Sequence, residues 1–313
     1  MRFDRRAVIY SFVLTIFVIW LHAGESLLSS IPGQTAVPGF FLISGYLFTR
    51  SLSGGGGESS SKDLKLIKEK LKRRVKTLLV PYLLWNTLYF IIYLCFGRAQ
   101  LSDAFLAVFH YKYNPVFWYL FQLMLITVLM PLLYFALKGK ITGIVFLAAF
   151  FAAAVFCGRF PFHYCNEDAL FYYSLGAFSG LCFKEEFEKT RNAKALIIAV
   201  CLFAAFSALK GILPAGVINA GTVGQRASGA VLLWTLTGFL PDFSPAPFTR
   251  VNFFIYAVHY LLIRLFWVAA GSLRDSTLLY VLMPLLCTAF SYGIYSLMKK
   301  YMPRILGILV GGR

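Results

Sequence analysis

The chain has 313 residues, of which 59% are hydrophobic and only 14% are charged. A soluble domain of this size needs more charge to cover its surface, so this composition excludes a soluble globular protein. The formal net charge of +17 invites a nucleic-acid interpretation. The positive charge lies in short segments between long apolar runs, however, and this placement is typical of membrane topology rather than of a phosphate-binding surface.

The apolar residues occur in blocks of about twenty, the length of a helix that crosses a bilayer. We therefore predict an all-α, polytopic membrane bundle that forms a single domain over residues 1–313. About ten spans are expected, at residues 7–24, 33–50, 77–97, 116–137, 141–158, 168–184, 193–210, 226–241, 250–270 and 277–299.

Lys and Arg are distributed unevenly over the predicted loops. If the N-terminus is cytoplasmic, 23 of the 30 Lys and Arg residues lie on the cytoplasmic side and six on the outer side, while Arg264 lies within a span. Cytoplasmic loops of membrane proteins carry an excess of positive charge. The sequence therefore predicts that both termini are cytoplasmic.

Two unusual segments follow the second predicted span. Residues 51–62 are rich in Gly and Ser, which predicts a flexible cytoplasmic linker. Residues 62–76 are strongly basic and carry Leu64, Ile67 and Leu71 at helical spacing. This second segment is predicted to be an amphipathic helix on the inner headgroups, leading into the third span.

His22 lies near the end of the first span, in an otherwise apolar run. An ionisable group is costly there, so a functional role is the default hypothesis. Imidazole suits a general base that takes a proton from a hydroxyl. His22 lies about 22 Å along the helix from Ala7, in the outer third of a core about 30 Å thick. Glu25 shares its face and could orient the ring. The alternative is an interfacial histidine bonded to nearby backbone.

Other polar residues fall within or at the ends of the spans. Ser44, beside Gly45, either lines an acyl tunnel or serves close helix packing. Trp118 and Tyr119 open the fourth span, where aromatic rings stack on sugars or form the ordinary interfacial belt.

The ninth span contains His259 and Arg264. An intramembrane arginine needs a partner or a wet cavity, so Arg264 is expected to line the substrate path. His259 either lines the same path or is a satisfied core residue.

Three basic residues, Arg73, Arg74 and Lys76, precede the third span. They form a collar that would attract the phosphates of coenzyme A, or alternatively serve topology and anionic lipid. The six cysteines lack metal-ligand spacing, and no metal is expected. Cys157 and Cys165 flank one predicted outer loop, where they either form a disulfide or remain free thiols.

Five short stretches occur in order along the chain: residues 20–22 (Trp-Leu-His), 37–48, 70–85, 117–120 (Phe-Trp-Tyr-Leu) and 254–259. In this order and spacing they resemble the membrane-bound acyltransferase 3 family, which acylates sugars of cell-surface and extracellular polysaccharides. The resemblance extends over about residues 4–300.

The resemblance implies about ten helices, an acyl-CoA donor reached from the cytoplasm, no permanently bound cofactor, and a catalytic histidine that maps onto His22. Family members usually carry Arg or Lys eleven residues earlier, where this chain has Ser11. Ser11 and His22 share a helix face about 16 Å apart. Either another cation such as Arg5, Arg6 or Arg264 takes that part, or the donor is handled differently.

The expected function is therefore an integral membrane O-acyltransferase, with a bacterial inner membrane as its simplest location. It would move an acyl group, acetyl above all, from acyl-CoA to a hydroxyl of a glycan or glycolipid on the outer side, with no nucleic-acid partner. One alternative is a secondary transporter or polysaccharide exporter, although the chain shows no internal repeat. The other is a non-catalytic protein that recruits partners through its basic inner face.

Overall fold

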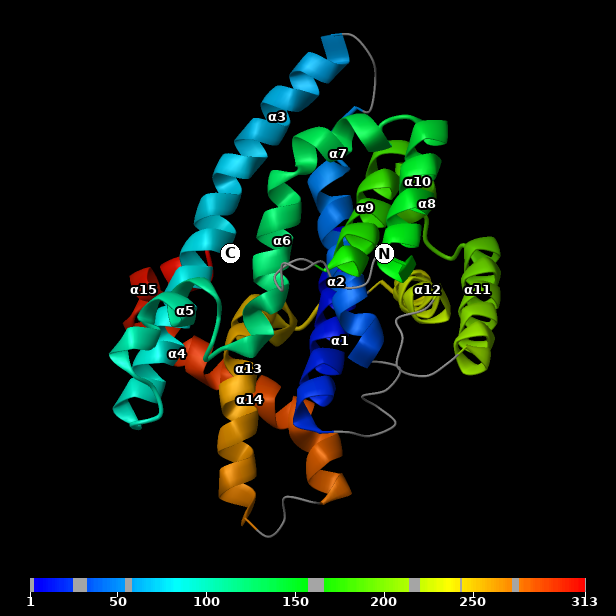
Figure 1. The fold of residues 1–313 in the computed structure, drawn as a ribbon. Helices are drawn as coiled ribbons and strands as arrows, with labels where there is room; N and C mark the ends of the chain where they lie inside the picture. The colour runs from blue at the N-terminus through cyan, green and yellow to red at the C-terminus, as the bar shows by residue number, and fades with distance from the viewer. Residues whose placement is uncertain are drawn as a thin grey trace.

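The structure is a computed structural model that describes residues 3–24, 33–53, 58–156, 166–213, 220–242, 244–271 and 276–312. The described part is 86% helical and contains no strand, which confirms the predicted all-α class (Figure 1). Ten helices or bent pairs coincide with the predicted spans: α1 (Phe3–Ala23), α2 (Gln34–Thr49), α4 (Val80–Cys95), α6 (Trp118–Val128) with α7 (Met130–Leu137), α8 (Lys140–Phe156), α9 (Glu167–Cys182), α11 (Ala193–Ile212), α12 (Ala220–Thr237), α13 (Asn252–Ala270) and α14 (Thr277–Tyr301).

Five helices in the described part are long and apolar enough to cross a bilayer, or six if the bent pair α6–α7 is one span. The other predicted spans form shorter or less apolar helices. Several spanning helices make the chain a multi-pass membrane protein. The shorter elements are α3 (Glu58–Arg74), α5 (Ala104–Phe109), α10 (Lys184–Glu188) and α15 (Pro303–Leu309).

The backbones of α2 and α9 approach closely at glycines. A Cβ atom on Gly45 would lie 2.1 Å from the carbonyl oxygen of Tyr173, and one on Gly176 would lie 1.8 Å from that of Leu42. Only glycine allows this approach, which is the usual role of small residues between membrane helices. Gly45 thus serves close packing of α2 on α9.

Two helices are interrupted where a proline removes a backbone donor. The π-helical turn Val75–Leu79 joins α3 to α4 just before Pro81. The α6 and α7 axes meet at 65°, and Pro131 lies in the first turn of α7. Proline cannot donate the i→i−4 hydrogen bond, so the helix bends or widens at these positions.

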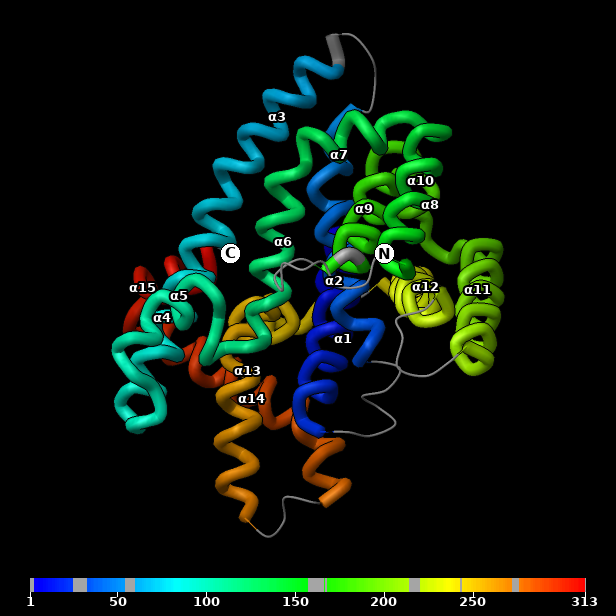
Figure 2. Tube along the Cα trace, in the orientation of Figure 1, coloured from blue at the N-terminus to red at the C-terminus, as the bar shows by residue number. Residues whose placement is uncertain are grey.

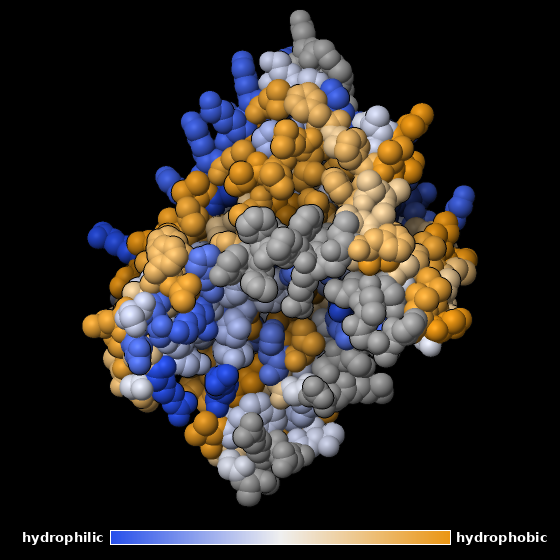
Figure 3. Space-filling model, viewed as in Figure 1, coloured by the Kyte–Doolittle hydropathy of each residue, from blue (hydrophilic) through white to orange (hydrophobic). Residues whose placement is uncertain are grey.

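Helix α3 is amphipathic, as the sequence predicts. Ile67 is buried, Leu64 and Leu71 pack against the core, and Lys65 and Lys68 between them are exposed. Hydrophilic side chains extend from this helix in Figure 3, and Figure 2 shows it projecting from one end of the bundle. The helix begins at Glu58, so the predicted linker 51–62 is wrong over its last residues, where helix formation extends the amphipathic segment.

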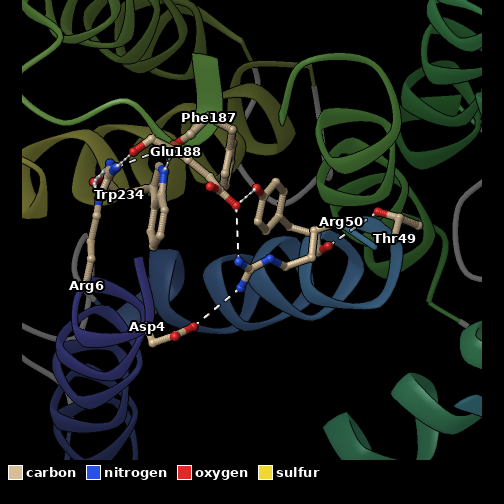
Figure 4. A network of polar contacts seen from close by, with 8 residues as sticks. Asp4, Arg6, Thr49, Arg50, Phe187, Glu188 and Trp234 are labelled. Atoms are coloured by element: carbon tan, nitrogen blue, oxygen red, sulfur yellow. Dashed lines mark hydrogen bonds and ion pairs between the residues drawn. The ribbon is translucent and has the colours of Figure 1, made fainter. Parts of the chain in front are cut away.

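Near the start of α1, Arg6 joins the ends of two other helices (Figure 4). Its buried guanidinium donates to the carbonyl oxygens of Trp234 in α12 and of Phe187 and Glu188 in α10, and stacks 3.8 Å over the Trp234 ring. The last carbonyls of a helix lack intrahelical donors. Arg6 supplies such donors and fastens α10 and α12 to α1.

Candidate functional site

A cavity of about 660 Å³ lies between α1, α2, α6 and the start of α13. This volume falls within the range of about 300–1,000 Å³ that is usual for ligand pockets. Most of its wall is apolar. The side chains with polar groups in its wall are Ser11, Thr15, Ser44, Arg74, Thr77, Tyr119, Thr249, Arg250, Asn252, Tyr256 and Tyr295.

Two arginines line the cavity. Arg74 is the last residue of α3 and lies 5.9 Å over the ring of Phe48, in the last turn of α2. Arg250 lies in the 3₁₀ turn Pro247–Val251, directly before α13. Neither arginine forms an ion pair with a carboxylate in the part of the chain that the structure describes. Both are therefore available to an anionic ligand.

Tyrosines form another part of the cavity wall. The hydroxyls of Tyr119 and Ser44 lie 3.3 Å apart, within hydrogen-bonding distance. The ring centroids of Tyr119 and Tyr256 are 6.0 Å apart, and the Tyr256 hydroxyl donates to the carbonyl oxygen of Val116. The structure thus places two predicted residues, Ser44 and Tyr119, in one hydroxyl-lined wall.

Tyr256 contacts one of a pair of histidines that come from α1 and α13. His259 is fully buried one turn further along α13, and its ring centroid lies 5.8 Å from that of Tyr256. The His22 ring of α1 lies 5.5 Å from the His259 ring and 6.2 Å from the Tyr260 ring. His22 therefore faces α13. It does not itself line the cavity, and the path of contacts from the cavity to His22 runs through Tyr256 and His259.

Contacts with α14 hold the last turns of α1 in place. The indole Nε1 of Trp20 donates to the carbonyl oxygen of Val281 at 3.3 Å, and the Tyr280 hydroxyl donates to the carbonyl oxygen of Trp20 at 3.2 Å. Because Trp20 is two residues before His22, this clasp fixes the helix rotation that turns the imidazole towards α13.

Several predicted residues lie away from the cavity. Trp118 is half-buried and packs 6.4 Å from the Phe41 ring. Arg264 is exposed and donates to the Tyr260 hydroxyl at 2.7 Å. Arg73 and Lys76 are exposed, so Arg74 is the only member of the predicted collar that lines the cavity. The predicted residues that lie outside the described part are Glu25, Cys157 and Cys165.

Ser11 lines the cavity, and the cations expected to replace its missing charge are engaged elsewhere. Arg5 pairs with Asp242 at 3.1 Å, and the Arg6 guanidinium is occupied by helix carbonyls. The cations in the cavity wall are Arg74 and Arg250. Sequence analysis missed Arg250, although a basic residue at the very start of an apolar span is the signal that could have found it.

A polar cluster occupies the predicted outer segment 98–115. The Asp103 carboxylate accepts hydrogen bonds from the Lys112 ammonium at 2.6 Å and from the Tyr113 hydroxyl. The bond from Lys112 lowers the pKa of the Asp103 carboxyl, and the same bond raises the pKa of Lys112. Within the described ranges, no group of three His, Cys, Asp or Glu side chains is placed to hold a metal ion.

The fold and site define a multi-pass helical membrane protein whose cavity is lined by two arginines and by Tyr256, which contacts the His259–His22 pair. The family model Acyl_transf_3, described as an acyltransferase domain, matches residues 11–296. The chain therefore belongs to this acyltransferase family, which confirms the resemblance found in its sequence motifs. No curated protein and no solved structure matches the chain.

Proposed function

We propose that the chain transfers an acyl group, acetyl above all, from cytoplasmic acyl-CoA to a hydroxyl of a glycan or glycolipid on the outer side of a bacterial inner membrane. The proposal includes ten spans and cytoplasmic termini. The observation that carries it is the composition of the cavity wall. The wall contains two arginines that form no ion pair with a carboxylate among the described residues. It also contains Tyr256, which contacts His259 of the His259–His22 pair.

The donor enters the cavity beside Arg74 and Arg250. Coenzyme A carries several phosphates, and arginine binds phosphate through charge-assisted, often bidentate hydrogen bonds. Arg74 and Arg250 supply these contacts, while the exposed Arg73 and Lys76 raise the local concentration of the anion. The apolar wall then accommodates the rest of the donor, and its acyl end is directed past Tyr119 and Tyr256 towards His22.

The reaction is an acyl transfer with His22 as general base. The acceptor oxygen attacks the thioester carbonyl carbon while His22 takes the hydroxyl proton, a C–O bond forms and the C–S bond breaks. The proton then passes from His22 to the departing thiolate.

The exposed lysines of α3 support the assignment of sides. Basic segments of membrane proteins face the cytoplasm, where they also meet anionic headgroups. Lys62, Lys65 and Lys68 are exposed on this helix. Arg74 is the last residue of α3 and lines the cavity. We therefore place the entrance for acyl-CoA on the cytoplasmic side.

Acyl transfer by the reconstituted protein tests the proposal. Wild-type protein, given acyl-CoA labelled in the acyl group together with envelope glycolipids, is expected to label the glycolipid fraction. His22→Ala is expected to bind acyl-CoA normally but to transfer the label about 10²–10⁴-fold more slowly, because the general base is lost.

His110→Ala is the matched control and is expected to keep the wild-type rate, because His110 lies in the segment between α5 and α6 and does not line the cavity. A wild-type protein that exports glycolipid without labelling it would refute the proposal in favour of a transporter. Full activity of His22→Ala would refute the base assignment.

A further inference from the structure

We propose that His259 is a positioning residue that fixes the tautomer of His22. In this arrangement Nε2 of His259 accepts the N–H of His22, and the second ring nitrogen of His22 is left as the base. The inference deepens the proposed function and rests on it. It assigns to a neutral imidazole of α13 the orienting role that Glu25 was predicted to play.

The tautomer of His259 follows from its own hydrogen bond. Its Nδ1 lies 2.6 Å from the carbonyl oxygen of Tyr256. A carbonyl oxygen only accepts hydrogen bonds, so Nδ1 carries the proton. In a neutral imidazole the other nitrogen is then an acceptor. Nε2 of His259 therefore presents a lone pair rather than a proton.

That lone pair has no donor in the described part of the chain. Nε2 of His259 is buried and makes no hydrogen bond there. Buried polar atoms in proteins are almost always paired, and each exception calls for an explanation. The His22 ring is the neighbouring side chain with an N–H to offer, at 5.5 Å between centroids and 42° between ring planes.

A small rotation of the His22 side chain closes the remaining gap between the two rings. Hydrogen bonds of catalytic groups are often long before substrate binds and tighten in the reacting complex. On its other side His22 meets the edge of Tyr260, whose hydroxyl accepts from Arg264. The ring is thus held between two residues of α13, and His259 is the one with a free acceptor.

The pairing has a direct chemical consequence. With one N–H of His22 held by His259, the other nitrogen is unprotonated and free to receive the proton of the acceptor hydroxyl. The imidazolium that forms keeps its hydrogen bond to the His259 lone pair, which stabilises the charge until the proton passes to the thiolate. A triad aspartate plays the same part for its histidine. No net proton change occurs on His259.

Two substitutions separate hydrogen bonding from packing. His259→Phe keeps a ring but removes both nitrogens. His259→Gln keeps an oxygen that can accept from His22 and an amide that can donate to Tyr256. We expect His259→Phe to lower kcat about 10²–10⁴-fold, as for other losses of a tautomer-fixing group. KM for acyl-CoA should not change, since His259 does not line the cavity. The kcat of His259→Gln should be at least tenfold higher than that of His259→Phe.

The nitrogen spectrum of the histidines gives a readout independent of turnover. The chain has only four histidines, so protein labelled with ¹⁵N-histidine gives few signals, and single substitutions at each, including His110→Gln, assign them. We expect His22 to show one neutral tautomer in the wild type and in His259→Gln, and a mixture of both tautomers in His259→Phe.

An unchanged His22 spectrum or an unchanged kcat in His259→Phe would overturn the inference. If His259→Phe does not fold, the spectrum of His259→Gln decides, because a mixture of His22 tautomers there is the contradicting result. If the wild-type protein transfers no acyl group, the proposed function fails, while the spectra still show whether His259 fixes the tautomer of His22.

Discussion

Arg74 and Arg250 are cations in the cavity wall without a carboxylate partner among the described residues, and this singles them out from the other basic groups near it. Arg6 is saturated by carbonyl oxygens, and Arg5 is held by Asp242. Ser11 and Arg250 line the same cavity, and we propose that Arg250 supplies the charge that Ser11 lacks.

Arg250→Gln is expected to raise KM for acyl-CoA about 10- to 100-fold, because a hydrogen bond between charged groups contributes about 1.5–3 kcal/mol. The value of kcat should change little, because Arg250 lies six residues before Tyr256, about 9 Å away along the helix axis. Steady-state kinetics with varied acyl-CoA measure both constants. Arg304→Gln, in an exposed residue outside the cavity, is the control. Equal KM values for the two variants would remove Arg250 from the donor site.

At the level of single elements, helix positions were predictable because apolar blocks of membrane length leave little choice of secondary structure. Most predicted spans coincide with one helix to within about four residues, while span 226–241 begins six residues later than α12 and span 116–137 covers the bent pair α6–α7. The bend between α6 and α7 was not predicted, although Pro131 marks it. The sequence predicted that the amphipathic helix leads into the third span, but not the π-helical turn between α3 and α4, because hydropathy gives no signal for backbone hydrogen-bond register.

The contact of α2 with α9 depends on the absence of a side chain at Gly176. Gly176→Ala is expected to lower the apparent Tm in detergent by about 5 °C or more, because a Cβ 1.8 Å from the Leu42 carbonyl forces the helices apart. Gly293→Ala in α14 is the matched control, since a Cβ there meets nothing within 4 Å. Equal Tm values for both variants would show that the two helices do not pack this closely.

At the scale of the whole molecule, the cavity could not have been predicted from the sequence. Its wall draws on α1, α2, α6 and α13, which lie far apart along the chain. Sequence motifs identified the family and the two histidines. Which serine, tyrosine or arginine meets the cavity depends on helix rotation, and hydropathy patterns do not fix helix rotation inside a bundle that is apolar on all sides. Arg264 and Trp118, considered as lining residues from the sequence, lie outside this cavity wall.

The proposed topology places both termini and α3 on the cytoplasmic side. A single cysteine introduced at Lys65 in a background without the native cysteines is expected to react with a membrane-impermeant maleimide only after the cells are opened, because α3 is exposed on that side. A cysteine introduced at Lys112 should react in intact cells. The reverse pattern would contradict the assignment of sides.

We propose that acyl-CoA lies in the 660 Å³ cavity, with its acyl end directed past the tyrosine wall towards His22. Photo-crosslinking with an acyl-CoA that carries a diazirine in its acyl chain tests this most directly, with mass spectrometry to locate the adduct. The account predicts adducts around Tyr119 and Tyr256, abolished by excess unlabelled acyl-CoA. Adducts confined to the exposed helix α11, or insensitive to competition, would contradict it.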